Sequence, residues 1–269
     1  MQRLGAGLAR GTGWFALLVV GVLAVVAILG FVLRPAGTTP PVMSDSLGPE
    51  SGEAVASYTE RAAETLVGEP GDPGSAGAER WALVSLDEVL TASEASAIAD
   101  FAGIRRISQV EIYAPVADVA MPVLPAAVAA PGPDDAGQSG PLGRAVLSGV
   151  TNSQYMLDHP EAGVAAAGTA DGGGTPSAGD ARMQAQVDYT AGEALAGRRV
   201  VAGFIARAGD EALATLARQP GVRAVEALPA DAVWGRFAVR PLLPEQRVAA
   251  TPLPDTGEVP APAPRVPAR

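Results

Sequence analysis

Few side chains in this sequence could do chemistry, and histidine is the rarest of them. The only imidazole is His159, which lies between Asp158 and Glu161. It could serve as a weak metal ligand or proton acceptor, but a metal site would need two further ligands from elsewhere in the chain. No serine lies in a nucleophile elbow that would form a triad with it. We expect a solvent-facing histidine in a polar turn.

A second candidate is the stretch Leu253–Gly257, whose sequence Leu-Pro-Asp-Thr-Gly fits the pentapeptide that sortases cleave. A sorting signal also needs an apolar span after the motif, and the residues that follow, EVPAPAPRVPAR, contain none. The triplet from Asp255 to Gly257 matches that of aspartic proteases, but such an aspartate must lie in a packed, paired site. Short motifs outside their structural context are mostly coincidental, and we interpret Leu253–Gly257 as a coincidental match in a proline-rich segment.

The glycine-rich, acidic and arginine motifs give no stronger indication of a functional site than these two candidates. Gly172–Gly174 has no preceding strand, following helix or lysine, so it is interpreted as a loop. Asp134–Asp135 and Asp171 could touch cations, but they lack EF-hand spacing. The pairs Arg105–Arg106 and Arg198–Arg199 each precede an expected strand and are interpreted as solubilising charges. The sequence therefore predicts no catalytic, cofactor-binding or metal-binding residue.

Composition excludes several classes of chemistry. The chain has no cysteine, which removes disulfides, thiolate metal sites, thiol nucleophiles and lipobox attachment. All nineteen basic residues are arginine, so Schiff-base chemistry and the phosphate-gripping lysine of P-loop enzymes are also excluded. Three arginines lie at positions 3, 10 and 34, which leaves sixteen against all 29 acidic residues, a charge of −13 after position 34. Such a surface repels nucleic acid and anionic lipid.

The element that positions everything else is Trp14–Leu33, twenty residues without a charge or a proline. A helix of this length spans about 30 Å, the thickness of a bilayer core. Arg3 and Arg10 precede it and Arg34 follows it, so the positive-inside bias places residues 1–13 in the cytoplasm. A cleaved signal peptide is the alternative, but its apolar core would be shorter. We expect an uncleaved, single-pass anchor that contacts the lipid bilayer.

Linkers are expected on both sides of one extracytoplasmic domain. Residues 34–78 mix Pro, Gly, Ser and acids, which predicts a disordered stalk in which Ser57–Val67 could form a short helix. Residues 241–269 contain a proline every few positions, which favours extended, unfolded chain. The domain is expected to cover 79–240.

Within the domain, the sequence twice shows a strand, a helix and a strand. In the first unit Arg80–Leu86 is an apolar run, Thr91–Glu94 has capping-box spacing, and polar and apolar residues alternate from Ile107. The second unit starts at Arg199. It continues with a helix capped by Asp210 and ends with a strand over Val222–Leu228, after which Trp234–Arg240 could add a fifth, edge strand. Between the units, residues 116–198 form a long insertion with helical composition over Leu142–Leu157 and Arg182–Ala196.

This order predicts an α+β fold of ferredoxin-like type, βαββαβ, in which four antiparallel strands carry both helices on one face. Two unrelated strand-helix units in an open α/β sheet are the alternative. The run from Gly203 to Val233 resembles the second half of the subtilisin-propeptide or peptidase-inhibitor family. The resemblance is carried by Glu211, Ala212, Leu213, Leu216, Pro220, Gly221, Val222, Val225 and Glu226, with residues 80–113 matching the first half more loosely. The whole chain also resembles actinomycete single-pass membrane proteins of unknown role.

Together these observations favour a non-enzymatic protein of the cell envelope that binds or scaffolds another envelope protein, or associates with itself through the open face or edge of its sheet. The family resemblance implies an alternative, a tethered inhibitor of subtilisin-type proteases or a chaperone-like module. In that alternative, the segment after Leu228 enters the protease active site. A hydrolase that uses carboxylates of the insertion has little support, because such groups are usually surface charges.

Overall fold

A five-stranded antiparallel sheet is the centre of the folded part, in a computed structural model that describes residues 45–67, 78–129, 140–159 and 177–262. All of these residues belong to the compact unit that begins at Met43. The predicted span Trp14–Leu33 lies outside the described residues. Within the described ranges, no helix is long and apolar enough to cross a membrane.

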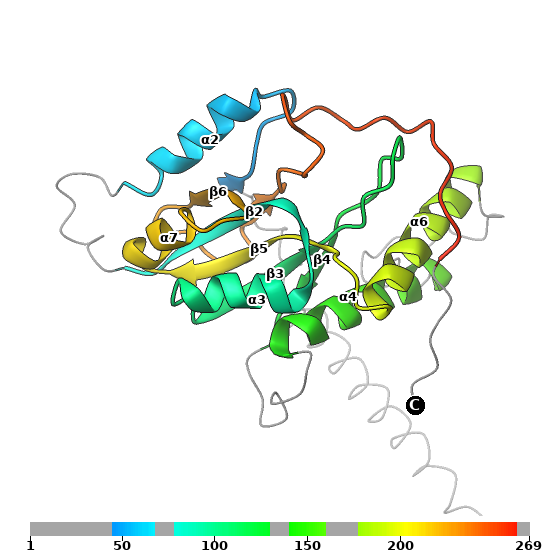
Figure 1. The fold of residues 1–269 in the computed structure, drawn as a ribbon, viewed down its shortest axis with the longest axis horizontal. Coiled ribbons are helices and arrows are strands. Elements are labelled where there is room, and N and C mark those ends of the chain that lie inside the picture. Colours follow the sequence, from blue (N-terminus) through cyan, green and yellow to red (C-terminus); the bar gives the residue numbers. More distant parts are fainter. Residues whose placement is uncertain (1–44, 68–77, 130–139, 160–176, 263–269) are drawn as a thin grey trace, which may run out of the picture. The chain divides into compact units, whose positions relative to one another are not determined.

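The five strands run in the order β4-β3-β5-β2-β6 (Figure 1). Their bounds are β2 Arg80–Leu90, β3 Arg106–Ile112, β4 Leu124–Ala127, β5 Val201–Ala208 and β6 Val222–Ala227. Each neighbouring pair is antiparallel. Helix α3 (Ala92–Phe101) joins β2 to β3, and α7 (Asp210–Leu216) joins β5 to β6. The two strand-helix-strand units are present, and the predicted mixed α+β class is confirmed.

Local sequence explains where α3 begins and ends. The Thr91 hydroxyl accepts from the Glu94 amide, and the Glu94 carboxylate accepts from the Thr91 amide, so the predicted capping box is present. Gly103, with φ of 73°, follows the helix in a backbone conformation that suits glycine. The predicted helix is confirmed.

Helix α7 differs from the prediction at its first turn. The cap is Gly209, and Asp210 is the first helical residue, without a side-chain cap. The Asp210 carboxylate instead accepts from Arg80 Nε at 2.8 Å and pairs with Arg80 Nη2 at 2.6 Å. The Asp210 carboxylate, which was expected to cap the helix, therefore pairs with the Arg80 guanidinium on the neighbouring strand.

The insertion folds onto the sheet through β4 and two helices, α4 (Gly140–Asp158) and α6 (Ala178–Leu195), which cover both predicted helical stretches. Gly149 lets α4 approach the sheet closely, because a Cβ there would lie 2.4 Å from the Ala126 Cβ on β4. The fifth strand of the main sheet is therefore β4, from the insertion, and not the predicted Trp234–Arg240. That segment forms β7 (Phe237–Val239) in a separate two-stranded sheet.

Helices α3, α4 and α7 cover one face of the sheet, and Figure 1 shows α3 and α4 on the opposite side from α2. Alternate residues of each strand point to this face, as the pleat requires. The main core here includes Val84, Ala95, Ala99, Val110, Ile112, Val146, Phe204, Leu213 and Leu216.

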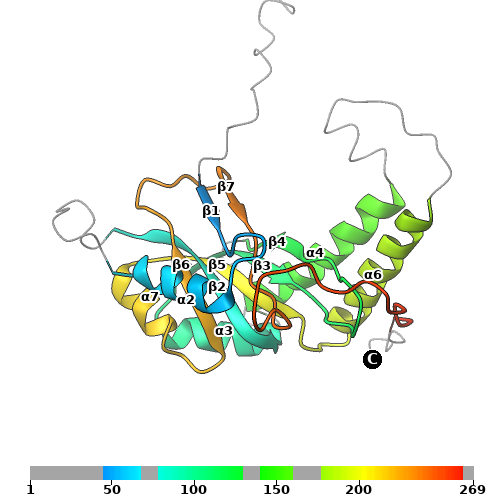
Figure 2. The same ribbon diagram turned by 90° about the horizontal axis from the view of Figure 1, so that it is seen from above.

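The predicted disordered stalk is wrong for residues 45–67, which cover the second face of the sheet, whereas the short helix predicted over Ser57–Val67 is present. Strand β1 (Asp45–Leu47) pairs in parallel with β7, as Figure 2 shows, and α2 (Val55–Glu64) packs over β6. Leu47 is buried against Leu83 and Ile205, and Tyr58 against Ala224. A polar composition concealed a few large apolar side chains that have a sheet face to cover.

The predicted disordered tail is likewise wrong for residues 241–262. Leu242 is fully buried, and its amide donates to the Ser85 hydroxyl at 3.3 Å. Farther on, Leu253 and Val259 pack against the cluster that contains Tyr113 and Met121. The prolines keep the backbone extended while the apolar residues between them are drawn onto the body, so the domain is larger than 79–240 at both ends.

Gly48 and Gly52 provide a test of how tightly residues 45–67 are docked on the second face of the sheet. Both have positive φ, 110° and 82°, but a Cβ on Gly48 would lie 1.7 Å from the Arg240 carbonyl oxygen, whereas a Cβ on Gly52 meets nothing within 4 Å. Gly52→Ala should cost about 1–2 kcal/mol of unfolding free energy through backbone strain alone. Gly48→Ala should cost roughly 1–3 kcal/mol more through overpacking.

The measurement is denaturant unfolding of the detergent-solubilised chain, followed by tryptophan fluorescence. Equal losses in the two variants would show that β1 is not held against β7.

Candidate functional site

His159 is exposed, as expected for a solvent-facing histidine. His159 follows the end of α4, where its Nδ1 lies 3.1 Å from the Tyr155 carbonyl oxygen and its ring stacks on Tyr155 at 4.3 Å between centroids. Glu161 lies outside the described residues, as do Asp134, Asp135, Asp171 and Gly172–Gly174. In the part of the chain that is described, no group of three His, Cys, Asp or Glu side chains could hold a metal ion.

The Leu-Pro-Asp-Thr-Gly motif is a strap on the body. The Thr256 and Gly257 amides both donate to the Asp118 carbonyl oxygen, at 2.9 and 2.7 Å. Asp255 accepts from the Ala120 amide and pairs with Arg182, which holds the pKa of this carboxyl below its usual range. Because its partner is a guanidinium and not a second carboxylate, Asp255 does not form an aspartic-protease dyad.

The two arginine pairs differ in what they contact. Arg199 bridges Glu88 and Glu94 at 3.1 and 2.6 Å, and all three side chains are largely exposed. Arg106 instead lies over the ring of Trp81, with its guanidinium carbon 5.0 Å from the centroid. None of these contacts leaves the arginines arranged as a phosphate site.

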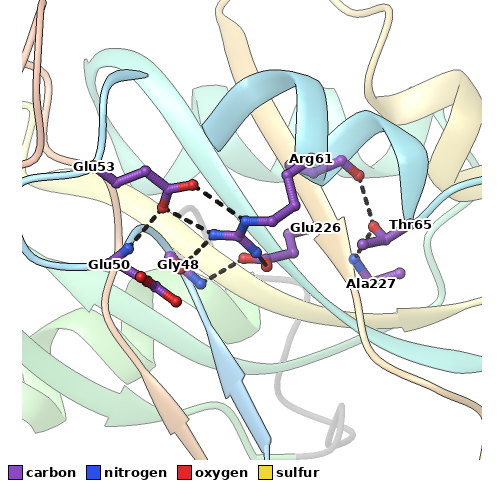
Figure 3. A network of polar contacts seen from close by, with 8 residues as sticks. Gly48, Glu50, Glu53, Arg61, Thr65, Glu226 and Ala227 are labelled. Atoms are coloured by element: carbon purple, nitrogen blue, oxygen red, sulfur yellow. Dashed lines mark hydrogen bonds and ion pairs between the residues drawn. The ribbon is translucent and has the colours of Figure 1, made fainter. Parts of the chain in front are cut away.

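A polar network joins α2 to the sheet (Figure 3). Arg61 Nη1 donates to Glu226 Oε1 on β6 at 2.5 Å, while its Nη2 and Nε donate to Glu53 at 3.0 and 3.2 Å. The second oxygen of Glu226 accepts from the Gly48 amide. At the C-cap of α2, the Thr65 hydroxyl accepts from the Ala227 amide at 2.8 Å. These bonds fasten the C-terminal end of α2 to β6.

The charges in this network satisfy each other. Glu226 is only 3% exposed, and both of its oxygens are occupied. The Arg61 hydrogen bond is the main reason that the pKa of Glu53 is lowered, and the same contact raises the pKa of Arg61. Burial raises the pKa of Tyr58, which lies beneath the Arg61 guanidinium. We interpret the network as a structural clamp, because its charged groups pair with one another.

A second buried carboxyl, Glu111 on β3, has a different environment. It is 2% exposed, and its described partner is the Gln109 amide, which donates at 2.7 Å. No ion pair joins it to an arginine of the described ranges. Burial therefore raises the pKa of this carboxyl. Glu111 lies on the same face of the sheet as Glu226, but no arginine of the described residues forms an ion pair with it.

The candidate binding site is a cleft of about 650 Å³ where the end of α3, the start of β3, the end of β4 and the start of α4 meet. Its apolar lining includes Ile104, Val128 and Leu142, and Ser96, Asp100, Arg105 and Ser108 supply polar groups. Phe101, the neighbour of Asp100, is 75% exposed. The cleft can accept an apolar side chain beside charges of both signs.

The serines that line the cleft have no histidine among its other described lining residues. Ser96 and Ser108 are potential nucleophiles, but a serine needs a general base. The only histidine of the chain is His159, which is occupied with Tyr155. Ser108 instead accepts a hydrogen bond from Arg106 Nε at 3.2 Å. The arrangement therefore suits binding better than acyl transfer.

Sequence reasoning missed both the clamp and the cleft. Arg61 and Glu226 are 165 positions apart, and Arg61 lay in the expected stalk. The cleft combines residues from both sides of the insertion boundary. The one available signal was Phe101, a large apolar residue off the buried Ala95 and Ala99 face of its helix.

No protein-family model matches this chain, and comparisons with curated proteins and with solved structures also found no match. The functional argument therefore depends on the geometry of the chain itself.

The two buried glutamates should respond oppositely to loss of charge. Glu111→Gln removes a carboxyl whose raised pKa makes the fold less stable as pH increases above about 4.3, the ordinary value for glutamate. This variant should match the parent near pH 4 and be more stable at pH 7. Glu226→Gln removes the charged partner of Arg61 and should lower stability at pH 7 by about 2 kcal/mol.

Denaturant unfolding of both variants across pH 4 to 7 makes the measurement. A Glu111→Gln variant that is destabilised throughout would show that the Glu111 carboxylate has a favourable role in the fold.

Proposed function

We propose that this chain is a membrane-anchored, extracytoplasmic, non-enzymatic binding or scaffolding protein of the cell envelope, a single-pass protein with its N-terminus in the cytoplasm. The observation that carries the proposal is the apolar stretch Trp14–Leu33, followed after only eleven residues by the folded body at Asp45. Such a short connection suits a module that works close to the bilayer.

The body is proposed to be an elaborated ferredoxin-like domain. Without β4, the strands have the order β6-β2-β5-β3, all antiparallel, with α3 and α7 on one face. This is the order expected for two interleaved strand-helix-strand units. The additions are β4, α4 and α6 from the insertion, and the segments that cover the second face.

Those covering segments change which surface is proposed to bind the partner. Ferredoxin-like sheets can associate through an open face, but here β1, β7 and α2 occupy it. We therefore assign partner binding to the cleft and to the exposed Phe101, the sequence neighbour of the cleft residue Asp100. The partner is proposed to be another envelope protein, or a second copy of this chain, that offers an apolar side chain.

The inhibitor alternative receives no specific support from the body. It requires the segment after Leu228 to enter a protease active site. Residues 229–236 instead lead through a turn to β7, where Phe237 is buried and β7 pairs with β1. Inhibition stays a prediction of the family resemblance.

Membrane topology is testable because the chain has no native cysteine. A cysteine at Val248, which is 83% exposed, should react with a membrane-impermeant maleimide in intact cells. A cysteine at Ala6 should react only after permeabilisation, since it precedes the span. Deleting 14–33 should move the protein to the soluble fraction. The reverse labelling pattern would overturn the outward placement.

Partner binding at the cleft is testable by photo-crosslinking in intact cells. A benzophenone amino acid in place of Phe101 should give a discrete adduct, because this side chain is exposed and its sequence neighbour Asp100 lines the cleft. The same amino acid at Val248, also exposed, serves as the matched control and should give none. Equal adducts at both positions, or none at Phe101, would contradict the assignment.

A further inference from the structure

The turn Val233–Arg236, which we term the tip, exposes large apolar side chains on a short loop before β7. Val233 is 53% exposed and Trp234 is 39% exposed, and Arg236 is exposed as well. Gly235, with φ of 80°, allows the turn. Exposed tryptophan beside valine and arginine needs an explanation, because water is a poor environment for the first two.

The tip is supported by a buried aromatic cluster. The Trp234 ring lies 4.7 Å from that of Trp81 and 5.7 Å, edge on, from that of Phe237. Trp81 itself is buried beneath the guanidinium groups of Arg106 and Arg207, whose carbons lie 5.0 and 5.3 Å from its centroid. The exposed side chains are therefore held in place by the core.

Strand pairing places the tip at the end of the body where the chain enters from the anchor. Because β1 and β7 are parallel, Asp45 lies opposite Phe237, three residues after Trp234. Figure 2 shows these two strands side by side. Eleven residues separate Leu33 from Asp45. Fully extended, they reach at most about 40 Å.

Charged residues of both signs lie near the tip in sequence, in strand register or against its aromatic cluster, whereas the chain as a whole is acidic. Arg106, Arg207 and Arg236 lie on or beside the cluster. Asp231 precedes the tip, Asp45 pairs in register with Phe237, and Glu79 lies 3.7 Å from Arg207. The chain carries a formal charge of −10, which repels anionic lipid, but these three cations and three anions cancel.

We infer that the tip inserts into the interfacial layer of the bilayer that holds the chain's own anchor, an inference that rests on the proposed membrane anchoring. Tryptophan favours this layer, where its ring is buried among lipid and its N–H is hydrated. A tether of eleven residues keeps the tip at high effective concentration near the surface, so a weak contact is enough. The balanced charge makes the contact independent of anionic lipid.

The test uses the full chain in phosphatidylcholine vesicles, with and without phosphatidylglycerol. Three single-cysteine variants carry the same environment-sensitive fluorophore: Ala27→Cys in the anchor, Val233→Cys in the tip, and Val248→Cys as the exposed control. Lipid-borne nitroxide and aqueous iodide quench the label from the two sides. We expect position 233 to be several-fold more protected from iodide than position 248, equally in both lipid mixtures.

The three positions separate failure of the inference from failure of the anchor. If the label at position 27 is quenched from the lipid while the label at position 233 is quenched from water, the tip contact is overturned and the anchor stands. Water at both positions overturns the anchor and the tip contact together. Lipid exposure at 233 with water at 27 supports the tip contact as a membrane site in its own right. Protection at 233 only with phosphatidylglycerol overturns insertion and indicates headgroup attraction instead.

Discussion

The body depends on covering the second face of its sheet. Helices α3, α4 and α7 bury one face, and a sheet with an apolar second face would leave Leu83, Ile205 and Trp81 in water. The chain meets this need with segments from its two ends, and the Arg61–Glu226 contact fastens the first of them. With Arg61 removed, Glu226 would be a buried charge without a cation, which is costly. The clamp thus makes α2 an obligatory part of the body.

This arrangement ties the two ends of the chain to each other. Asp45 begins a strand whose partner, β7, follows the last strand of the sheet, and Ala54 pairs with Ala249. Residues from α2 and from the C-terminal segment share one buried cluster with Ala224. The leading and trailing segments therefore form one layer, and neither acts as a free linker. Binding surfaces must then lie at the edges and ends of the sheet.

Local patterns in the sequence were sufficient for the two strand-helix-strand units. The Thr91–Glu94 spacing predicted a capping box because both partners lie within one turn, and the alternation from Ile107 predicted β3 because the pleat has a period of two. The helices of the insertion were also predicted from composition. In each case the interactions that decide the structure lie within a few residues of each other.

Neither the clamp nor the docking of the C-terminal segment could be predicted from local patterns. Arg61 finds Glu226 only after the sheet has formed, and Leu242 is buried only because Ser85 and Tyr58 lie beneath it. Proline-rich, polar composition is typical of disordered chain, yet a few apolar residues at suitable spacing were enough to dock it. Asp210 shows the same limit at smaller scale, since its carboxylate pairs with Arg80, which is 130 positions away in the sequence but on the adjacent strand.

Neither the candidate cleft nor the exposed tip could be predicted from local sequence patterns, for two different reasons. The cleft exists because the insertion returns β4 and α4 beside the start of β3, so its walls come from segments that sequence analysis treated separately. The tip was visible in the sequence as Trp234, which was assigned to a strand because aromatic residues favour strands. Pairing of β7 with β1 begins only at Phe237 and leaves Trp234 on the turn before it. The segment that was expected to be a stalk therefore determines which aromatic residue is exposed, and it places this residue near Asp45, where the described body begins.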